Sequence, residues 1–177
     1  MKYYSITCEE FANVKEECDL VKVVNGVIYV SSEKELKEPF KAVTLPESIT
    51  KEIEEELVKA KKSKKEEIDK AKFSAIEDGV EYKGKVFQSA EYDRNLLTST
   101  VSLFNIAGKV PDGFVWIAED NTAVPMTLQD LLQLSQVMAL DVTANTIKAR
   151  TLKDSVEKAK TLDEVNAIKF DLEDDKA

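Results

Sequence analysis

The residue types that most often carry out chemistry in proteins are scarce in this chain. There is no histidine, and the two cysteines, Cys8 and Cys18, lie ten positions apart. Two thiols without histidine do not make a zinc site, and the commonest general base is missing. The five glycines form no phosphate-binding loop. We therefore expect no enzyme activity, no catalytic or metal-binding residue and no cofactor. A disulfide between the two cysteines is possible, but nothing requires it, and we expect a reducing compartment.

A few residues could still act in binding. Asp120-Asn121 could hold a cation, although this pair is more typical of a turn. Arg94 is the only arginine before Arg150; it either ties the start of a helix to a ribbon through a salt bridge or contacts a partner. Trp116 is the one tryptophan, and we expect it to anchor a ribbon on Phe104 rather than to bind a ligand. The alternative of a small enzyme predicts a pocket with converging polar groups.

Composition limits the classes of partner. The 177 residues carry a net charge of −9. Because neutralisation of phosphates dominates affinity for nucleic acids, an acidic chain is a poor candidate for binding DNA or RNA. The one lysine-rich stretch, "KAKKSKK", is flanked by acidic residues. No apolar run approaches the ~20 residues of a membrane span, and the start of the chain lacks the apolar core of a signal peptide. We therefore expect a soluble protein made in the cytoplasm.

Hydrophobic patterns and turn signals predict an α+β, mainly helical fold. Residues 1–46 are expected to form a small N-terminal module, because "DLVKVVNGVIYVSS" places Asn25-Gly26 between two β-branched runs, a pattern typical of a type I′ hairpin. The capping-box spacing of Thr7 and Glu10 predicts a helix over residues 8 to 17. The stretch after Pro39 resembles a linker.

The rest of the chain is expected to form a charged linking helix over residues 47–78, a C-terminal domain over residues 79–170 and an acidic tail over residues 171–177. In the C-terminal domain a ribbon turning at Lys83-Gly84 precedes a helix from about Ser89 to Ala107. A second ribbon turns at residues 119–121. A long helix capped by Thr127 then runs from Leu128 to about Lys160.

Both long helices carry a narrow apolar stripe, with steps of mostly three and four residues. Each stripe either packs within the chain or forms a coiled coil with another copy. Lys64 interrupts the first stripe, and Asn145 lies within the second, where a polar residue can set register. The candidate seam for an oligomer or partner consists of Ile53, Leu57, Ala60, Ile68, Met138, Val142, Asn145, Leu152 and Val156.

Residues 66–168 resemble a known family. A helix runs into "GVEYKGKVF", Asp93-Arg94 follows, and "VWIAEDN" ends in an Asp-Asn turn. "PMTLQDLL" then starts the long helix, and "KAKTLDEV" closes the pattern. In this order and spacing the segment resembles the uncharacterised domain found toward the C-terminus of bacteriophage and prophage tail proteins.

The resemblance implies a role in protein–protein assembly. The expected function is a non-enzymatic structural component of a phage tail, associated with fibre attachment or the baseplate. The protein would lie in the host cytoplasm during assembly and then in the virion tail. Its partners would be other tail proteins and copies of itself, with a trimer expected because fibre-linked parts are often threefold. The alternative is a transient assembly chaperone for tail fibres.

Overall fold

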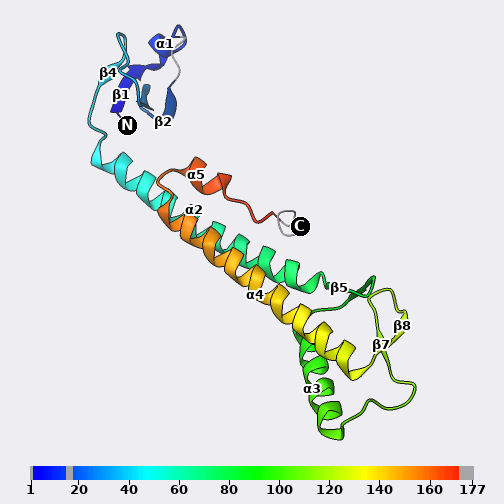
Figure 1. The fold of residues 1–177 in the computed structure, drawn as a ribbon. Coiled ribbons are helices and arrows are strands. Elements are labelled where there is room, and N and C mark those ends of the chain that lie inside the picture. The colour runs from blue at the N-terminus through cyan, green and yellow to red at the C-terminus, as the bar shows by residue number, and fades with distance from the viewer. Residues whose placement is uncertain (1, 15–17, 172–177) are drawn as a thin grey trace. The chain divides into compact units, whose positions relative to one another are not determined.

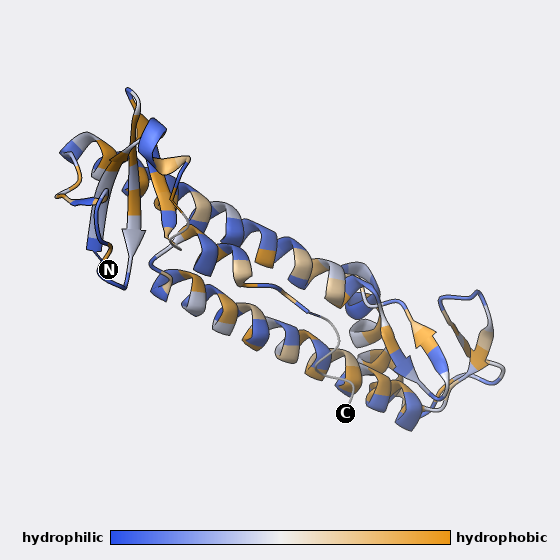
Figure 2. Cartoon of the chain, turned by 90° about the horizontal axis from the view of Figure 1, so that it is seen from above, coloured by the Kyte–Doolittle hydropathy of each residue, from blue (hydrophilic) through white to orange (hydrophobic). Residues whose placement is uncertain are grey.

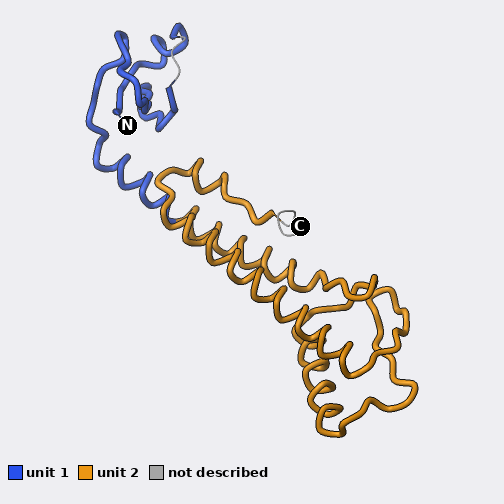
Figure 3. The backbone as a smooth tube through the Cα atoms, in the orientation of Figure 1, with its two compact units in different colours: residues 1–58 blue, residues 59–177 orange. Residues whose placement is uncertain are grey.

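The computed structural model describes residues 2–14 and 18–171. It is a mixed α+β structure, 53% helical and 19% strand, in which a sheet precedes the helices, and this confirms the predicted class (Figure 1). The chain divides into two compact units, residues 1–58 and 59–177 (Figure 3). This division falls inside a long helix, between Val58 and Lys59. The sequence instead predicted domain boundaries at the two ends of that helix.

Unit 1 contains a four-stranded sheet with the order β2-β3-β1-β4. Its strands are β1 (Lys2–Thr7), β2 (Asp19–Val24), β3 (Val27–Ser32) and β4 (Lys41–Ala42), and neighbouring strands are antiparallel. The predicted β2–β3 hairpin is confirmed, because Asn25 and Gly26 both have positive φ, 49° and 79°. The residues predicted as a linker after Pro39 instead include β4, which pairs with β1.

The core of unit 1 lies on one face of this sheet. It consists of Tyr4, Ile6, Ile28, Val30, Leu36 and Phe40. The short helix α1 (Cys8–Phe11) has the predicted capping box between Thr7 and Glu10, but it ends at Ala12, so the expected helix to residue 17 was too long. Residues 15–17 of that prediction lie outside the described part of the chain.

Unit 2 is built from a helix pair and two small ribbons. The helix α2 (Glu47–Glu77) leads into the first ribbon, which consists of β5 (Val80–Tyr82) and β6 (Lys85–Phe87). The helix α3 (Glu91–Ala107) connects it to the second ribbon, β7 (Val115–Ile117) and β8 (Ala123–Pro125). The helices α4 (Leu128–Lys158) and α5 (Leu162–Ala167) follow. Both predicted turns are present, since Lys83, Gly84 and Asn121 have positive φ. The capping box of Thr127 begins α4 as predicted, and a second capping box at Thr161 begins α5.

Two hydrophobic clusters hold unit 2 together. The larger joins both ribbons, α3 and the first turns of α4, and its buried residues are Val80, Phe87, Leu97, Phe104, Ala118, Met126, Leu131, Leu134 and Met138. The smaller joins α2 to α4 through Ile68, Ala149 and Val156, with Leu152, Ile168 and Phe170 packed against it. Within unit 2, α2 and α4 lie side by side and antiparallel (Figure 1), and hydrophobic and hydrophilic residues are interspersed along both helices (Figure 2).

Candidate interaction surface

Helix α3 is apolar on two sides. Leu97 and Phe104 are buried against the larger cluster, as an amphipathic helix requires. A second apolar stripe remains exposed, with Ser99 at its centre. We call this stripe the α3 surface, and its residues are Tyr92, Leu96, Ser99, Leu103 and Ile106.

The spacing explains why these side chains share one face. The steps between them are four, three, four and three residues, which keeps them within one strip of a helix with 3.6 residues per turn. Leu103 is 63% exposed and Ile106 is 85% exposed. Such large apolar side chains gathered on one exposed strip are characteristic of a surface that binds another protein.

A groove borders the α3 surface where β7 passes the helix. Its volume is about 360 Å³, and it is lined by Gln88, Asp93, Leu96, Thr100, Phe114, Val115, Trp116 and Ile117. Leu96 belongs both to the groove and to the α3 surface, so the two form one continuous apolar region. The lining has one ionisable side chain, that of Asp93, and this favours an apolar partner.

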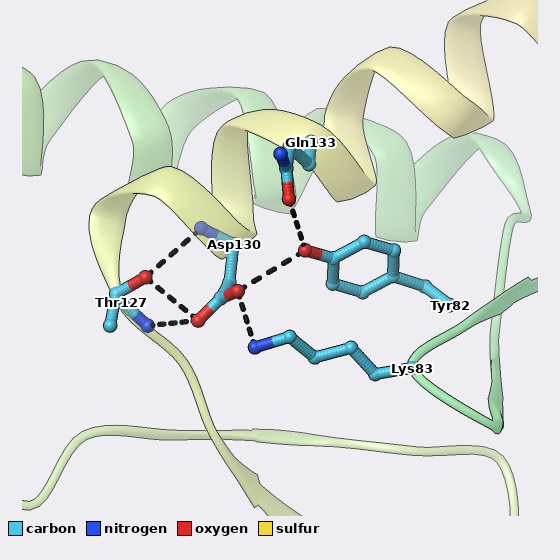
Figure 4. A network of polar contacts seen from close by, with 5 residues as sticks. All are labelled: Tyr82, Lys83, Thr127, Asp130 and Gln133. Carbon is cyan, nitrogen blue, oxygen red and sulfur yellow. Dashed lines mark hydrogen bonds and ion pairs between the residues drawn. The ribbon is translucent and has the colours of Figure 1, made fainter.

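A polar network fixes the first ribbon to the start of α4 (Figure 4). Asp130 accepts hydrogen bonds from the Thr127 amide at 2.9 Å and the Thr127 hydroxyl at 2.7 Å, and its carboxylate pairs with the Lys83 ammonium. The Tyr82 hydroxyl lies 3.2 Å from Asp130 Oδ1 and 2.6 Å from Gln133 Oε1, and its single proton serves one of them at a time.

The network shifts the titration of its members. The hydrogen bond from Lys83, followed by those from Thr127, holds the pKa of Asp130 well below its usual range. The same contact raises the pKa of Lys83, and burial followed by the Asp130 hydrogen bond raises the pKa of Tyr82. The shifts of Asp130 and Lys83 favour the charged forms that make the ion pair, and the shift of Tyr82 favours its neutral, hydrogen-bonding hydroxyl, so this arrangement is a structural clamp.

A second set of contacts positions the β7–β8 ribbon. Lys85 donates to Asp120 at 2.7 Å and to Thr122 at 3.2 Å, and the Glu119 amide donates to the Val86 carbonyl at 2.9 Å. Asp120 also accepts from the Thr122 amide at 2.9 Å. The Asp120-Asn121 pair that was considered for a cation therefore serves the turn and its ion pair with Lys85.

The predicted structural anchors occupy different positions around α3. Phe104 is buried, and its ring meets that of Phe114 edge-on at 5.0 Å. Trp116 is half-buried and lies 6.3 Å from Phe114, so Phe114 is the ring between Trp116 and Phe104. The Arg94 guanidinium donates to the carbonyl of Ser89, just before the helix, rather than forming a salt bridge to a ribbon.

The predicted seam divides into buried and partly exposed residues. Ile68, Met138 and Val156 are buried within unit 2, so they are not available to a second copy. Asn145 donates to the Asp141 carboxylate and carbonyl of its own helix, both at 3.1 Å. The remaining seam residues are half-buried, namely Ile53, Leu57, Ala60, Val142 and Leu152.

The sequence did contain a signal for the α3 surface. Two apolar stripes run through residues 91–107, one through Leu97, Val101 and Phe104 and the other along the α3 surface. The second stripe was overlooked because one apolar face is the usual number for a surface helix. A count of charges would have drawn attention to it, since residues 95–107 contain none.

Two further properties concern the described residues alone. They contain no group of three or more His, Cys, Asp or Glu side chains placed to hold a metal ion. Among the helices seen in residues 2–14 and 18–171, none combines the length and apolar character needed to cross a membrane.

Comparison with known protein families gives a match over most of unit 2. A family model described as a domain of unknown function (DUF4376) matches residues 59–172, which begin at the first residue of unit 2. No curated protein matches the chain, and no solved structure matches it.

Proposed function

The chain belongs to the DUF4376 family, and from this premise we propose that it is a non-enzymatic structural component of a phage or prophage tail, associated with fibre attachment or the baseplate. The similarity of residues 66–168 to the domain found in tail proteins supports this assignment. The partners in this proposal are other tail proteins and further copies of this chain. The protein acts first in the host cytoplasm and then in the assembled tail.

The observation that carries the proposal is the exposed apolar region formed by the α3 surface and the groove beside β7. Its large side chains include Tyr92, Leu103 and Ile106, which are well exposed. Apolar regions of this kind bind protein partners because their burial removes apolar area from water. A structural part of a multi-subunit particle needs such a surface.

Within this proposal the ribbon–helix–ribbon unit acts as a rigid support. The Asp130 network ties β5 and β6 to α4, and Lys85 ties that ribbon to the turn between β7 and β8. The two ribbons thereby hold α3 in place with its outer stripe exposed. The unit presents a binding surface and also ties the ribbon that follows α2 to the start of α4.

The test is quantitative mass spectrometry of purified phage particles that encode this chain. A structural component is expected in every particle at a fixed ratio to the other tail proteins. Presence in infected cells but absence from finished particles would contradict a structural role. That result would favour the alternative, a transient assembly chaperone for tail fibres, since an exposed apolar region also suits temporary binding.

A matched pair of variants tests the surface itself. Leu103 and Leu140 are equally exposed, at 63% and 61%, but only Leu103 belongs to the α3 surface. Leu103→Glu is expected to reduce the number of infectious particles at least ~10-fold, whereas Leu140→Glu on α4 leaves it near the wild-type value. Equal loss in both variants would show that the α3 surface has no special role.

A further inference from the structure

The α3 surface differs from the rest of the chain in its charge. One third of all residues are charged, and the net charge is −9. Two copies of this chain therefore repel each other over most of their surfaces. Residues 95–107, by contrast, contain no charged side chain, so this part of α3 can meet its own copy without like-charge repulsion.

We propose that a second copy of this chain covers the α3 surface, with the two α3 helices packed antiparallel about a twofold axis at Ser99. In an isologous contact each residue meets the residue placed symmetrically about the axis. Centring the contact at Ser99 sets Tyr92 directly against Ile106. It also places Leu96 beside Leu103 of the other copy, offset by one residue along the helix axis. Each large side chain thereby faces another apolar side chain.

The side-chain sizes along the stripe fit this register. Ser99 is the one small residue of the α3 surface and lies at its middle. A small residue at the crossing point lets two helix backbones approach, while the larger residues on both sides interdigitate. The steps of four and three residues are those of a coiled-coil seam, which matches a shallow crossing angle of about 20°.

Charges at the two ends of α3 favour the antiparallel direction. Glu91 and Asp93 lie in the first turn, and Lys109 follows the helix by two residues. An antiparallel pair brings Lys109 of each copy near Glu91 of the other. Within residues 2–14 and 18–171, neither Glu91 nor Lys109 forms an ion pair, so both are available.

The same charges oppose the threefold arrangement expected from the sequence. Parallel α3 helices would gather three copies of Glu91 and Asp93 at one end and three copies of Lys109 at the other. The interface we propose is therefore a dimer. It does not depend on the assignment to a phage tail, because it rests on α3 alone and is tested on the purified chain.

Light scattering on the full-length protein at micromolar concentration is the first test. The wild type is expected at twice the chain mass of 19.9 kDa. Leu103→Glu is expected to weaken association at least ~100-fold and to give monomers. Leu140→Glu is the control, and its mass should remain that of the dimer. Circular dichroism of each variant confirms that a change in mass is not caused by unfolding.

Cross-linking tests the register. With Cys8 and Cys18 replaced by serine, Ser99→Cys is expected to form a disulfide between copies under mild oxidation, because the twofold axis brings position 99 of one copy against position 99 of the other. Asn105→Cys, on the other side of α3, should not cross-link.

The direction of the helices is tested by charge reversal, since Lys109→Glu should weaken the dimer and Glu91→Lys in the same chain should restore it.

Four results would overturn the proposal. The first is a monomer at every concentration tested, and the second is a trimer. The third is a dimer that Leu140→Glu disrupts while Leu103→Glu leaves it intact. Cross-linking of the Asn105→Cys variant without cross-linking of the Ser99→Cys variant would likewise exclude the Ser99 axis.

Discussion

At the scale of single residues, Asp130 links two parts of unit 2, the start of α4 and the first ribbon. Its carboxylate caps α4 through Thr127, and it pairs with Lys83 and Tyr82 from the first ribbon. The sequence identified the capping role, because Thr127 and Asp130 have capping-box spacing. It did not identify the contacts with Tyr82 and Lys83, since those residues lie almost fifty positions away and only the fold brings them together.

Replacement of Asp130 is expected to make stability less dependent on pH. Because the folded pKa of this carboxylate lies below its unfolded value, its contribution is fully present above about pH 4 and is lost as the pH falls toward the folded pKa. Asp130→Asn should cost about 1–2 kcal/mol at pH 7. Urea unfolding at several pH values should show the gap to wild type narrowing in acid; a gap of constant size would contradict the ionic contribution.

Position 79 requires glycine for two reasons, its backbone conformation and the atoms that surround it. Its φ is +89°, and a Cβ there would lie 2.7 Å from the carbonyl oxygen of Phe87. Gly113 has a similar φ of +77°, but a Cβ there would meet no atom within 4 Å. Gly113→Ala should therefore cost only the strain of the left-handed region, about 1 kcal/mol.

Gly79→Ala should cost at least about 2 kcal/mol, because it adds a backbone clash to the same strain. Thermal unfolding of the two variants checks this difference. Equal losses would mean that the β5–β6 ribbon moves away from the new methyl group at little cost.

At the scale of elements, the predictable features were those specified by neighbouring residues. The β2–β3 hairpin follows from Asn25-Gly26, and the start of α4 follows from the capping box at Thr127. β1 and β4 were not predicted, because "KYYSIT" and the two residues of β4 become strands only by pairing with distant partners. The sequence also did not predict what the apolar stripe of α4 packs against, because the same pattern suits a contact within the chain or a contact between copies.

The α2–α4 pair has a small core with ion pairs along its edge. Lys65 pairs with Glu157, and Lys153 pairs with Asp69 at 2.5 Å. The Lys65 contact lowers the pKa of Glu157, and the Lys153 contact lowers the pKa of Asp69. Because these four side chains are partly exposed, salt weakens their attraction, and the apolar contact at Ile68 is the larger stabilising factor.

Ile68→Ala is expected to loosen this helix pair selectively. Ile68 is 1% exposed, so the truncation should cost about 2–4 kcal/mol. Hydrogen exchange should increase over residues 59–77 and 149–170, while residues 80–138 keep their protection, because they belong to the larger cluster. Val58→Ala is the control, since Val58 is 68% exposed. An equal increase over all of unit 2 would show that its two clusters unfold together.

At the scale of the whole molecule, the two units have separate cores. The core of unit 1 uses residues between Tyr4 and Phe40, and the clusters of unit 2 use residues from Ile68 onward. Helix α2 is continuous across the division, yet no side chain between residues 50 and 67 is buried. The family match begins at residue 59, where unit 2 begins. Two cores joined by a helix segment without buried side chains are expected to unfold separately.

Calorimetry of the full chain should therefore show two transitions. Val30→Ala removes part of a fully buried side chain in unit 1 and should lower only one transition, by several degrees. Ile68→Ala should lower only the other. A single transition that both substitutions shift would contradict this expectation. It would show that α2 couples the unfolding of the two units, so that the chain unfolds as one cooperative unit despite its two separate cores.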